Sequence, residues 1–449
     1  MYSKDKLSLI GNAVQSRFIV SGKQRESVWD GGAKSQRVLW ICVATMLWLH
    51  LLFLIDYWHG MKRGYTDFSV LYTAGTILRE GLGHQLYNRE TQYRVQEDFT
   101  GSLPFRRGPL PYIHPPFEAP IFVPLAFLDY QQAFVTWDIL TLCTLFAVGF
   151  LLRQSIPILF SVLPWKFVLG ALAFYPVFTC FLQGQDSILQ LLFCAAGFQA
   201  LRKKADIFAG CCFAMGAFKF QFMIPLVFLL FVWGRRRIAI GFAVIAAALA
   251  LVSLGIVGRD ALLQYPRFAL QIVEVPGLGG VPLALMPNLH GLVVGWRGPL
   301  SGTTGLALAI IASILVVSFA AWTGQVRTSL AGLELQFSLA IIVSVLIGWQ
   351  TNAHDLSLLV IPLVLLADYC FHTVPPKSGF TLLLPVVPLL ITPFWMALWL
   401  SFAKVNLMAI PMLWWVWVIG KELSHVSQKE FSNSSKQWSE SMVTEREGG

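Results

Sequence analysis

The chain has 449 residues, of which 56% are hydrophobic and only 13% are charged. Soluble globular domains carry about 25% charged residues, so a soluble fold of this composition would expose too much apolar surface. Apolar stretches close to ~20 residues, the length that crosses a bilayer, recur along most of the chain. These observations exclude a soluble protein and predict an all-α polytopic membrane protein, because a β-barrel would show short alternating segments instead.

The net charge of +9 comes largely from short basic clusters beside apolar segments, such as Arg202–Lys204 and Arg235–Arg237. Clusters of this kind mark the cytoplasmic ends of membrane helices. Nucleic-acid-binding proteins carry continuous basic surfaces, so we expect no nucleic acid as a partner. The seven cysteines all lie in apolar segments, and no CxxC or HExxH motif is present. We therefore expect neither a disulfide framework nor a metal.

The predicted elements begin with a polar tail, residues 1–37, which its basic residues assign to the cytoplasm. A first span at about residues 38–55 is followed by a long outer loop, residues 56–114, with juxtamembrane helices. Two short apolar runs flank Lys219. Further spans are predicted near residues 135–152, 167–181, 188–201, 238–257, 303–322, 335–349, 356–371, 380–400 and 405–420. The total is roughly eleven to thirteen transmembrane helices.

Residues 115–152 are interpreted as one net crossing, because two crossings would place Asp186 on the cytoplasmic side. The first part of that segment, Pro115–Leu128, is then interfacial or re-entrant. A second outer loop is expected at residues 258–300. The Ser-, Glu- and Lys-rich end, residues 421–449, is expected to be a disordered cytosolic tail. Residues 38–420 then form the membrane domain.

Polar residues embedded in apolar sequence gather on the outer side of this topology. Such groups are costly at membrane depth and are functional candidates by default. They are Asp67, His114, Gln185, Asp186, Lys219, Asn288, His290, His354 and Asp355. Any one of them alone can be a loop residue just outside the bilayer. Together they predict one outward-facing polar cavity.

Five short motifs contain these residues. The segment YTDFSVLYTAG at residues 65–75 has apolar residues at helical spacing, which predicts an amphipathic helix along the outer surface. Asp67, at its start, is either a helix N-cap or a general base. The other motifs are HPP at 114–116, GQDS at 184–187 with FKFQ at 218–221, PNLHG at 287–291, and NAHDL at 352–356.

In this order the motifs resemble those of glycosyltransferase family 87, and the resemblance covers about residues 38–370. Members of that family are integral membrane enzymes of the GT-C superfamily and include polyprenol-phosphate-mannose-dependent α-mannosyltransferases. The resemblance implies a GT-C-like helical bundle with a catalytic Asp in the first outer loop, which Asp67 matches. It also matches His354 to a His at the outer end of a late span, whereas His290 receives no role.

The resemblance further implies inverting transfer of a hexose, with mannose favoured, from a polyprenyl-phosphate donor to a lipid or glycan acceptor, without a cofactor. Asp67 would be the general base. The residues expected to bind the donor phosphate are Lys219, His354 and Arg63. Those expected to bind the sugar or acceptor are Gln185, Asp186, His114, Asn288 and Asp355. The implied location is a bacterial inner membrane, with the site facing the periplasm or exterior.

A polytopic transporter or lipid flippase is the alternative interpretation. A transporter would show internal repeats and ionisable groups near the middle of the membrane. The sequence shows no clear repeat, and its polar residues gather on one side. This asymmetry favours the enzyme.

Overall fold

The computed structural model describes residues 32–62, 66–100, 110–154, 156, 159, 162–274, 286–296, 303–325, 330–373, 376–392 and 406–447. All regular elements in these ranges are helices, so the prediction of an all-α fold is confirmed. Most of the predicted N-terminal tail, residues 1–37, lies outside the described residues, and so does Arg63.

Within the described ranges, five helical segments are long and apolar enough to cross a membrane. They are α2 (Gly32–Lys62), α5 (Tyr130–Arg153), α12 (Arg237–Glu274), α14 (Thr303–Thr323), and η8 (Ala353–Leu359) with α16 (Val360–His372). Two bent pairs raise the number to seven if each is one span: α7 (Pro164–Leu172) with α8 (Tyr175–Gln183), and α10 (Asp206–Met215) with η5 (Ala217–Lys219) and α11 (Phe220–Val232). The polytopic membrane class is therefore confirmed.

The number of full-length spans among the described residues is lower than the eleven to thirteen that hydropathy suggests. The reason is local geometry: the first pair bends by 83° and the second by 68°. In addition, the expected spans near 188–201 and 335–349 are the shorter apolar helices α9 (Ser187–Arg202) and α15 (Leu330–Ile347). A run of apolar residues therefore marks burial or membrane contact, but not a complete crossing.

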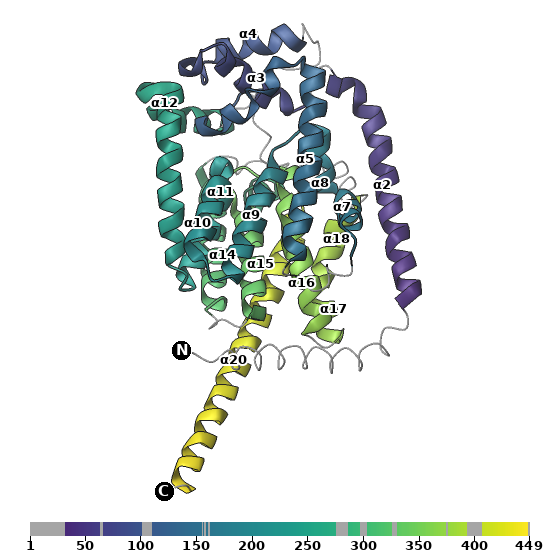
Figure 1. Cartoon of the computed structure of the whole chain (residues 1–449), viewed down its shortest axis with the longest axis vertical. Coiled ribbons are helices and arrows are strands. Elements are labelled where there is room, and N and C mark those ends of the chain that lie inside the picture. The colour runs from purple at the N-terminus through teal and green to yellow at the C-terminus, as the bar shows by residue number, and fades with distance from the viewer. Residues whose placement is uncertain are drawn as a thin grey trace, which may run out of the picture.

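The first outer loop forms a cap of short helices at one end of the bundle (Figure 1). It contains α3 (Phe68–Arg79), η2 (Gly83–Gln85) and α4 (Arg89–Thr100). The described part of the loop is therefore helical, in agreement with the helices predicted for it. The apolar stretch Pro115–Leu128 contains only the short 3-10 helices η3 (Pro116–Phe122) and η4 (Leu125–Phe127). It is not a span of its own, which agrees with the single net crossing predicted for residues 115–152.

Two hydrophobic cores organise the molecule. The larger core lies in the bundle and joins α9, α11, α15 and α16, with Phe198 and Phe337 fully buried. The smaller core lies under the cap, where Phe68 and Ile77 of α3 pack against Phe122 of η3 and the first turns of α5. The polar residues predicted to form a site come from both sides of the boundary between these cores.

The predicted second outer loop, residues 258–300, is partly helical. α12 continues through this region to Glu274 and is kinked at Gly258, where φ is 78° and ψ is 172°. Beyond the kink its outer part runs alongside the cap, in contact with η2 and η3 (Figure 1). α13 (Leu289–Trp296) follows, while residues 275–285 and 297–302 lie outside the described ranges.

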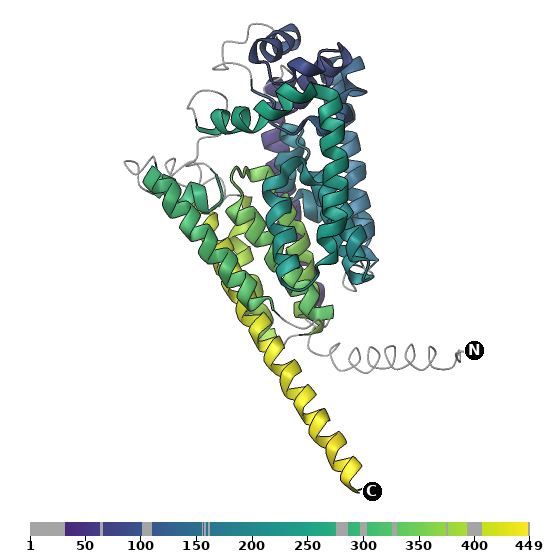
Figure 2. The same cartoon turned by 90° about the vertical axis from the view of Figure 1, so that its left-hand side faces the viewer.

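The prediction of a disordered C-terminal tail is wrong. α17 (Pro376–Leu383), η9 (Leu384–Val386) and α18 (Val387–Leu390) follow α16, and the last element, α20, is helical from Ala409 to Glu447. No Gly or Pro occurs between Gly420 and Glu447, and Glu, Lys and Gln are good helix formers. Low hydrophobicity therefore does not prevent a helix that is already nucleated in the bundle. Figure 2 shows the end of α20 projecting away from the bundle.

Candidate active site

A cavity of about 510 Å³ lies between the cap and the bundle. Its walls come from the start of α3, the segment before η3, the turn before α9, the η5–α11 junction, the outer part of α12, and the α15–η8 turn. Six of the nine predicted site residues line it: Asp67, His114, Gln185, Lys219, His354 and Asp355. The structure therefore brings together residues that lie far apart in the sequence.

Asp67 stands at the N-cap position of α3, but its side chain makes no capping hydrogen bond. Its Oδ2 atom accepts a hydrogen bond of 2.8 Å from the Gln185 amide, and its backbone N–H donates to Gln183 Oε1 at 3.3 Å. The carboxylate is thus held by the turn before α9 rather than by its own helix. The geometry therefore does not agree with the interpretation of Asp67 as a side-chain N-cap. The side chain lines the cavity instead, where the interpretation as a general base requires it.

Gly184 explains how the turn before α9 reaches Asp67. This residue ends α8 in the left-handed conformation, with φ 63°, which favours glycine. A Cβ atom there would lie 2.6 Å from the Cβ of Phe68, so a larger residue would push α3 away. The Gly184 carbonyl also accepts a 3.0 Å hydrogen bond from the Trp137 indole on α5. Gln185 and Asp186 are therefore placed by close packing of the cap on the bundle.

Lys219 forms the centre of a buried ionic network. Its ammonium group lies 2.7 Å from Asp186 Oδ1 and 2.6 Å from Asp355 Oδ1, and donates a 2.6 Å hydrogen bond to the Ser187 hydroxyl. An ammonium group has three donors, and each of them has an acceptor here. The residue is only 5% exposed. Lys219 is thus a charge built into the cavity wall and already compensated by two carboxylates.

The start of η8 holds Asp355 in place. Asn352 and Asp355 form a capping box, in which Asp355 Oδ2 accepts a 2.8 Å hydrogen bond from the Asn352 backbone N–H. Such reciprocal bonds satisfy backbone donors at a helix start. His354 directly precedes Asp355, and its Nε2 atom lies 3.5 Å from Asp355 Oδ1. The imidazole therefore borders both the cavity and the network.

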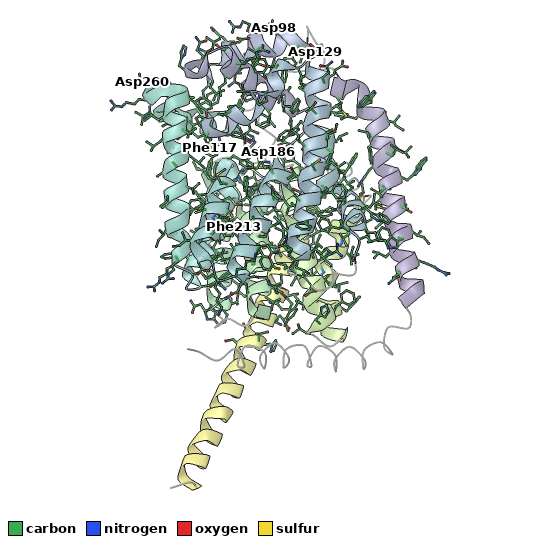
Figure 3. The ribbon with its side chains drawn as sticks, in the orientation of Figure 1. Asp98, Phe117, Asp129, Asp186, Phe213 and Asp260 are labelled. Carbon is green, nitrogen blue, oxygen red and sulfur yellow. The ribbon has the colours of Figure 1, made fainter. Side chains whose placement is uncertain are left out.

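A second cluster joins this network through Asp186. His114 Nδ1 lies 2.7 Å from Glu118 Oε2 and 3.2 Å from Asp186 Oδ2. Both carboxylates are fully buried, whereas the His114 side chain is 18% exposed. Figure 3 shows Asp186 between the end of the molecule that carries Asp98 and Asp129 and the middle of the bundle.

The protonation of the second cluster follows from burial and mutual charge. Burial lowers the pKa of His114, but the carboxylates of Glu118 and Asp186 outweigh it and raise the pKa to about 10. Burial raises the pKa of Glu118 to about 8, against the lowering effect of His114. Burial alone would raise the pKa of Asp186, but Lys219 and His114 hold that pKa well below its usual range. These directions favour an imidazolium at His114, a protonated Glu118 and an ionised Asp186.

The comparison with known protein families decides the class of chemistry. A sequence model of glycosyltransferase family 87 matches residues 112–349, more than half of the chain. The chain belongs to glycosyltransferase family 87. It is therefore a membrane glycosyltransferase, and the alternative of a transporter or flippase is not favoured. No curated protein and no solved structure matches the chain.

Two described residues of the predicted site of this glycosyltransferase, Asp186 and Asn288, do not line the cavity. Asp186 lies behind its wall, and Arg63 lies outside the described residues. Asn288 is fully buried: its amide donates a 2.7 Å hydrogen bond to the Gly348 carbonyl, and its Oδ1 accepts one of 2.8 Å from the Gly291 N–H. These bonds tie the start of α13 to the end of α15, which is a structural arrangement.

The ring of His290 packs against that of Trp349 in a tilted arrangement, with ring centroids 5.0 Å apart. Burial lowers the pKa of this histidine. Since its Nδ1 atom also lies 3.4 Å from the Trp349 carbonyl, its surroundings are those of a packed residue. The structure thus gives no reason to assign it a role in the glycosyltransferase site.

Sequence reasoning missed several residues of the site. Glu118 is the most informative, because it is the only charged residue in the apolar stretch Pro115–Leu128. An isolated carboxylate in apolar sequence is a functional signal, and this signal is sufficient to select Glu118 from the sequence as a candidate site residue. Ser187, Asn352, Phe218 and Phe220 belong to the motifs described above, but the sequence assigns them no role. The other residues that the sequence does not reveal are Gln183, which holds Asp67, and the wall residues Tyr265 and Trp349. Their types are too common in such sequences to reveal a site.

Proposed function

We propose that this glycosyltransferase transfers a hexose, with mannose favoured, from a polyprenyl-phosphate donor to a hydroxyl group of a lipid or glycan acceptor. The observation that carries the proposal is the placement of Asp67. Its carboxylate lines the cavity, makes no capping bond, and is oriented by Gln185 at 2.8 Å. A carboxylate held in this way can accept a proton from a hydroxyl group next to it.

The proposed reaction is a single displacement at the anomeric carbon. Asp67 takes the proton of the acceptor hydroxyl as its oxygen forms a bond to that carbon. The bond from the carbon to the phosphate oxygen breaks on the opposite side, and the electron pair leaves with the polyprenyl phosphate. This geometry inverts the anomeric configuration. Within the described residues Gln185 engages Oδ2 of Asp67, which leaves Oδ1 for the acceptor.

The donor phosphate is proposed to lie near His354. This imidazole lines the cavity, whereas each donor of the Lys219 ammonium already has an acceptor. We therefore assign direct hydrogen bonding of the phosphate to His354 and a longer-range electrostatic role to Lys219. Arg63 remains a predicted phosphate ligand. Gln185, His114 and Asp355, which line the same cavity, are proposed to contact the sugar or the acceptor.

A lipid-linked donor agrees with the apolar side of the cavity. Phe218, Phe220, Tyr265, Pro266 and Ala269 line it and come from the η5–α11 junction and α12. Phe220 is 44% exposed although it is a large apolar residue. In a membrane-spanning segment such exposure faces lipid. A polyprenyl chain can therefore extend from the cavity between these elements into the bilayer.

The side of the membrane follows from the basic clusters. α9 begins beside Asp186 and ends at Arg202, 16 residues later, which corresponds to roughly 24 Å. α11 similarly begins beside Lys219 and ends just before Arg235. Because such clusters lie in the cytoplasm, the cavity is proposed to face the opposite side, which is the periplasm or exterior if the membrane is a bacterial inner membrane. Residues 38–420 are then the catalytic membrane domain, with cytosolic tails at 1–37 and 421–449.

The donor is tested by supplying it to the purified chain. The protein is reconstituted in vesicles with membrane acceptors from a strain lacking its gene, and receives either radiolabelled polyprenyl-phosphate mannose or a radiolabelled nucleotide sugar. We expect transfer from the lipid-linked donor alone, and NMR of the product should show an inverted anomeric centre. Transfer from the nucleotide sugar without a lipid-linked intermediate, or retention of configuration, would contradict the proposal.

A further inference from the structure

The cluster of His114, Glu118 and Asp186 has the geometry of a ligand set. One potential ligand atom from each residue lies within 4.8 Å of the other two. His114 Nδ1 is 2.7 Å from Glu118 Oε2 and 3.2 Å from Asp186 Oδ2. Two of the residues come from the segment at η3, and the third comes from the turn before α9. Because they are separated in sequence, a search for contiguous metal motifs does not find them.

An unpartnered oxygen points independently to a missing ligand. Glu118 is fully buried, and its Oε1 atom has no hydrogen-bond partner among the described residues. A buried carboxylate oxygen without a partner is costly, and such groups call for an ion or water. The carboxylate already contacts His114 through Oε2. A cation bound to the Glu118 carboxylate would therefore give Oε1 the partner that it lacks among the described residues.

A divalent cation would replace the protons of His114 and Glu118 without changing the total charge of the wider network. Three carboxylates, Glu118, Asp186 and Asp355, surround a single lysine, Lys219. Lys219 contacts Asp186 through Oδ1, while Oδ2 of Asp186 is directed to His114. One divalent cation beside a neutral imidazole would balance the three carboxylates together with the lysine. The lysine and the cation would then use different oxygens of Asp186.

We propose that His114, Glu118 and Asp186 bind a divalent cation at the wall of the cavity. One imidazole and two carboxylates form a mixed nitrogen and oxygen set, which suits Mn²⁺ or Zn²⁺ better than Ca²⁺. Three protein ligands leave coordination positions free. The partly exposed His114 side chain lines the cavity, so those positions can be reached from it. The site is additional to the proposed reaction, which uses no metal.

Binding is measured on the full chain, purified with a chelator and placed in lipid nanodiscs without substrate. Mn²⁺ is added and followed by electron paramagnetic resonance. We expect one bound Mn²⁺ per chain with hyperfine coupling to a ¹⁴N nucleus, because one ligand is an imidazole. His114→Gln should remove the nitrogen coupling, and Glu118→Gln should weaken binding by at least about tenfold. The exposed residues His84 and Glu90 provide the matched controls His84→Gln and Glu90→Gln, which should leave both signals unchanged.

The readout does not depend on sugar transfer, so it stands or falls separately from the proposed function. If a variant fails to fold, as judged by thermal unfolding without metal, the wild-type spectrum alone decides. We expect one bound Mn²⁺ per chain that Zn²⁺ displaces. If the chain does not bind such a Mn²⁺, the proposal is overturned. Bound Mn²⁺ without nitrogen coupling, or with coupling that survives in a folded His114→Gln variant, would overturn it equally.

Discussion

Replacing Lys219 by methionine tests whether the buried network stabilises the fold. Met has a similar length but no charge, so Lys219→Met removes ammonium contacts of 2.7 and 2.6 Å to two buried carboxylates. Removing one partner of a buried ion pair costs about 3–5 kcal/mol, because the other charge is left uncompensated. Asp186 keeps His114 at 3.2 Å, and Asp355 keeps the Asn352 N–H at 2.8 Å. We therefore expect a loss of about 3–5 kcal/mol rather than twice that amount.

The free energy of unfolding is measured by detergent-induced unfolding, followed through the intrinsic fluorescence of the tryptophans. Lys203 is exposed, so Lys203→Met is the matched control and should change stability by less than about 0.5 kcal/mol. Adding Asp186→Asn and Asp355→Asn to Lys219→Met should recover most of the loss, since a neutral network leaves no unpaired charge. Equal effects of Lys219→Met and Lys203→Met, or no recovery in the triple variant, would refute the electrostatic reasoning.

Three further predictions concern the cap and the cavity. A Cβ at Gly75 would lie 2.5 Å from the Phe122 carbonyl oxygen, so Gly75→Ala should lower the free energy of unfolding by about 1–3 kcal/mol in the same assay. The matched control is Gly170→Ala, which should be neutral or stabilising because the space around Gly170 is open. Asn288→Ala should lower stability by about 1–3 kcal/mol without changing the donor KM; a raised KM at unchanged stability would restore its predicted role in sugar binding. Gln185→Met should slow single-turnover transfer about 10–100-fold by releasing the base, and an unchanged rate at saturating donor would contradict that positioning.

The class of the fold follows from the sequence because hydropathy and charge are averages over many residues. The low charge content and the basic clusters predict membrane helices and their ends. The pattern around Phe68 predicts the helix after Asp67, but not its burial: ten of the twelve residues of α3 are buried, so it is not the surface helix expected. Span lengths are less predictable. The bend between α7 and α8 and the short 3-10 helices after Pro115 depend on tertiary packing, which apolar character alone does not encode.

The candidate site was predictable where rare residue types occur in apolar sequence. Asp67, Gln185 and Lys219 stand out in this way, and the structure brings all three to one cavity. Partnership between residues is not visible in the sequence. Lys219 is paired with two carboxylates, and Asn288 joins α13 to α15 instead of facing the cavity. Both arrangements depend on three-dimensional positions that the spacing of the motifs does not specify.

The most direct test of the proposed reaction is the transfer rate of Asp67→Asn. Asparagine keeps the size of the side chain and its hydrogen bonding but cannot accept the acceptor proton at neutral pH. General-base catalysis contributes about 10²–10⁴-fold, so transfer from polyprenyl-phosphate mannose should fall at least about 100-fold while expression and unfolding stay at wild-type levels. Asp98→Asn, at an exposed position on α4, should transfer at the wild-type rate. Transfer by Asp67→Asn within a few fold of wild type would contradict the assignment of Asp67 as the base and the mechanism built on it.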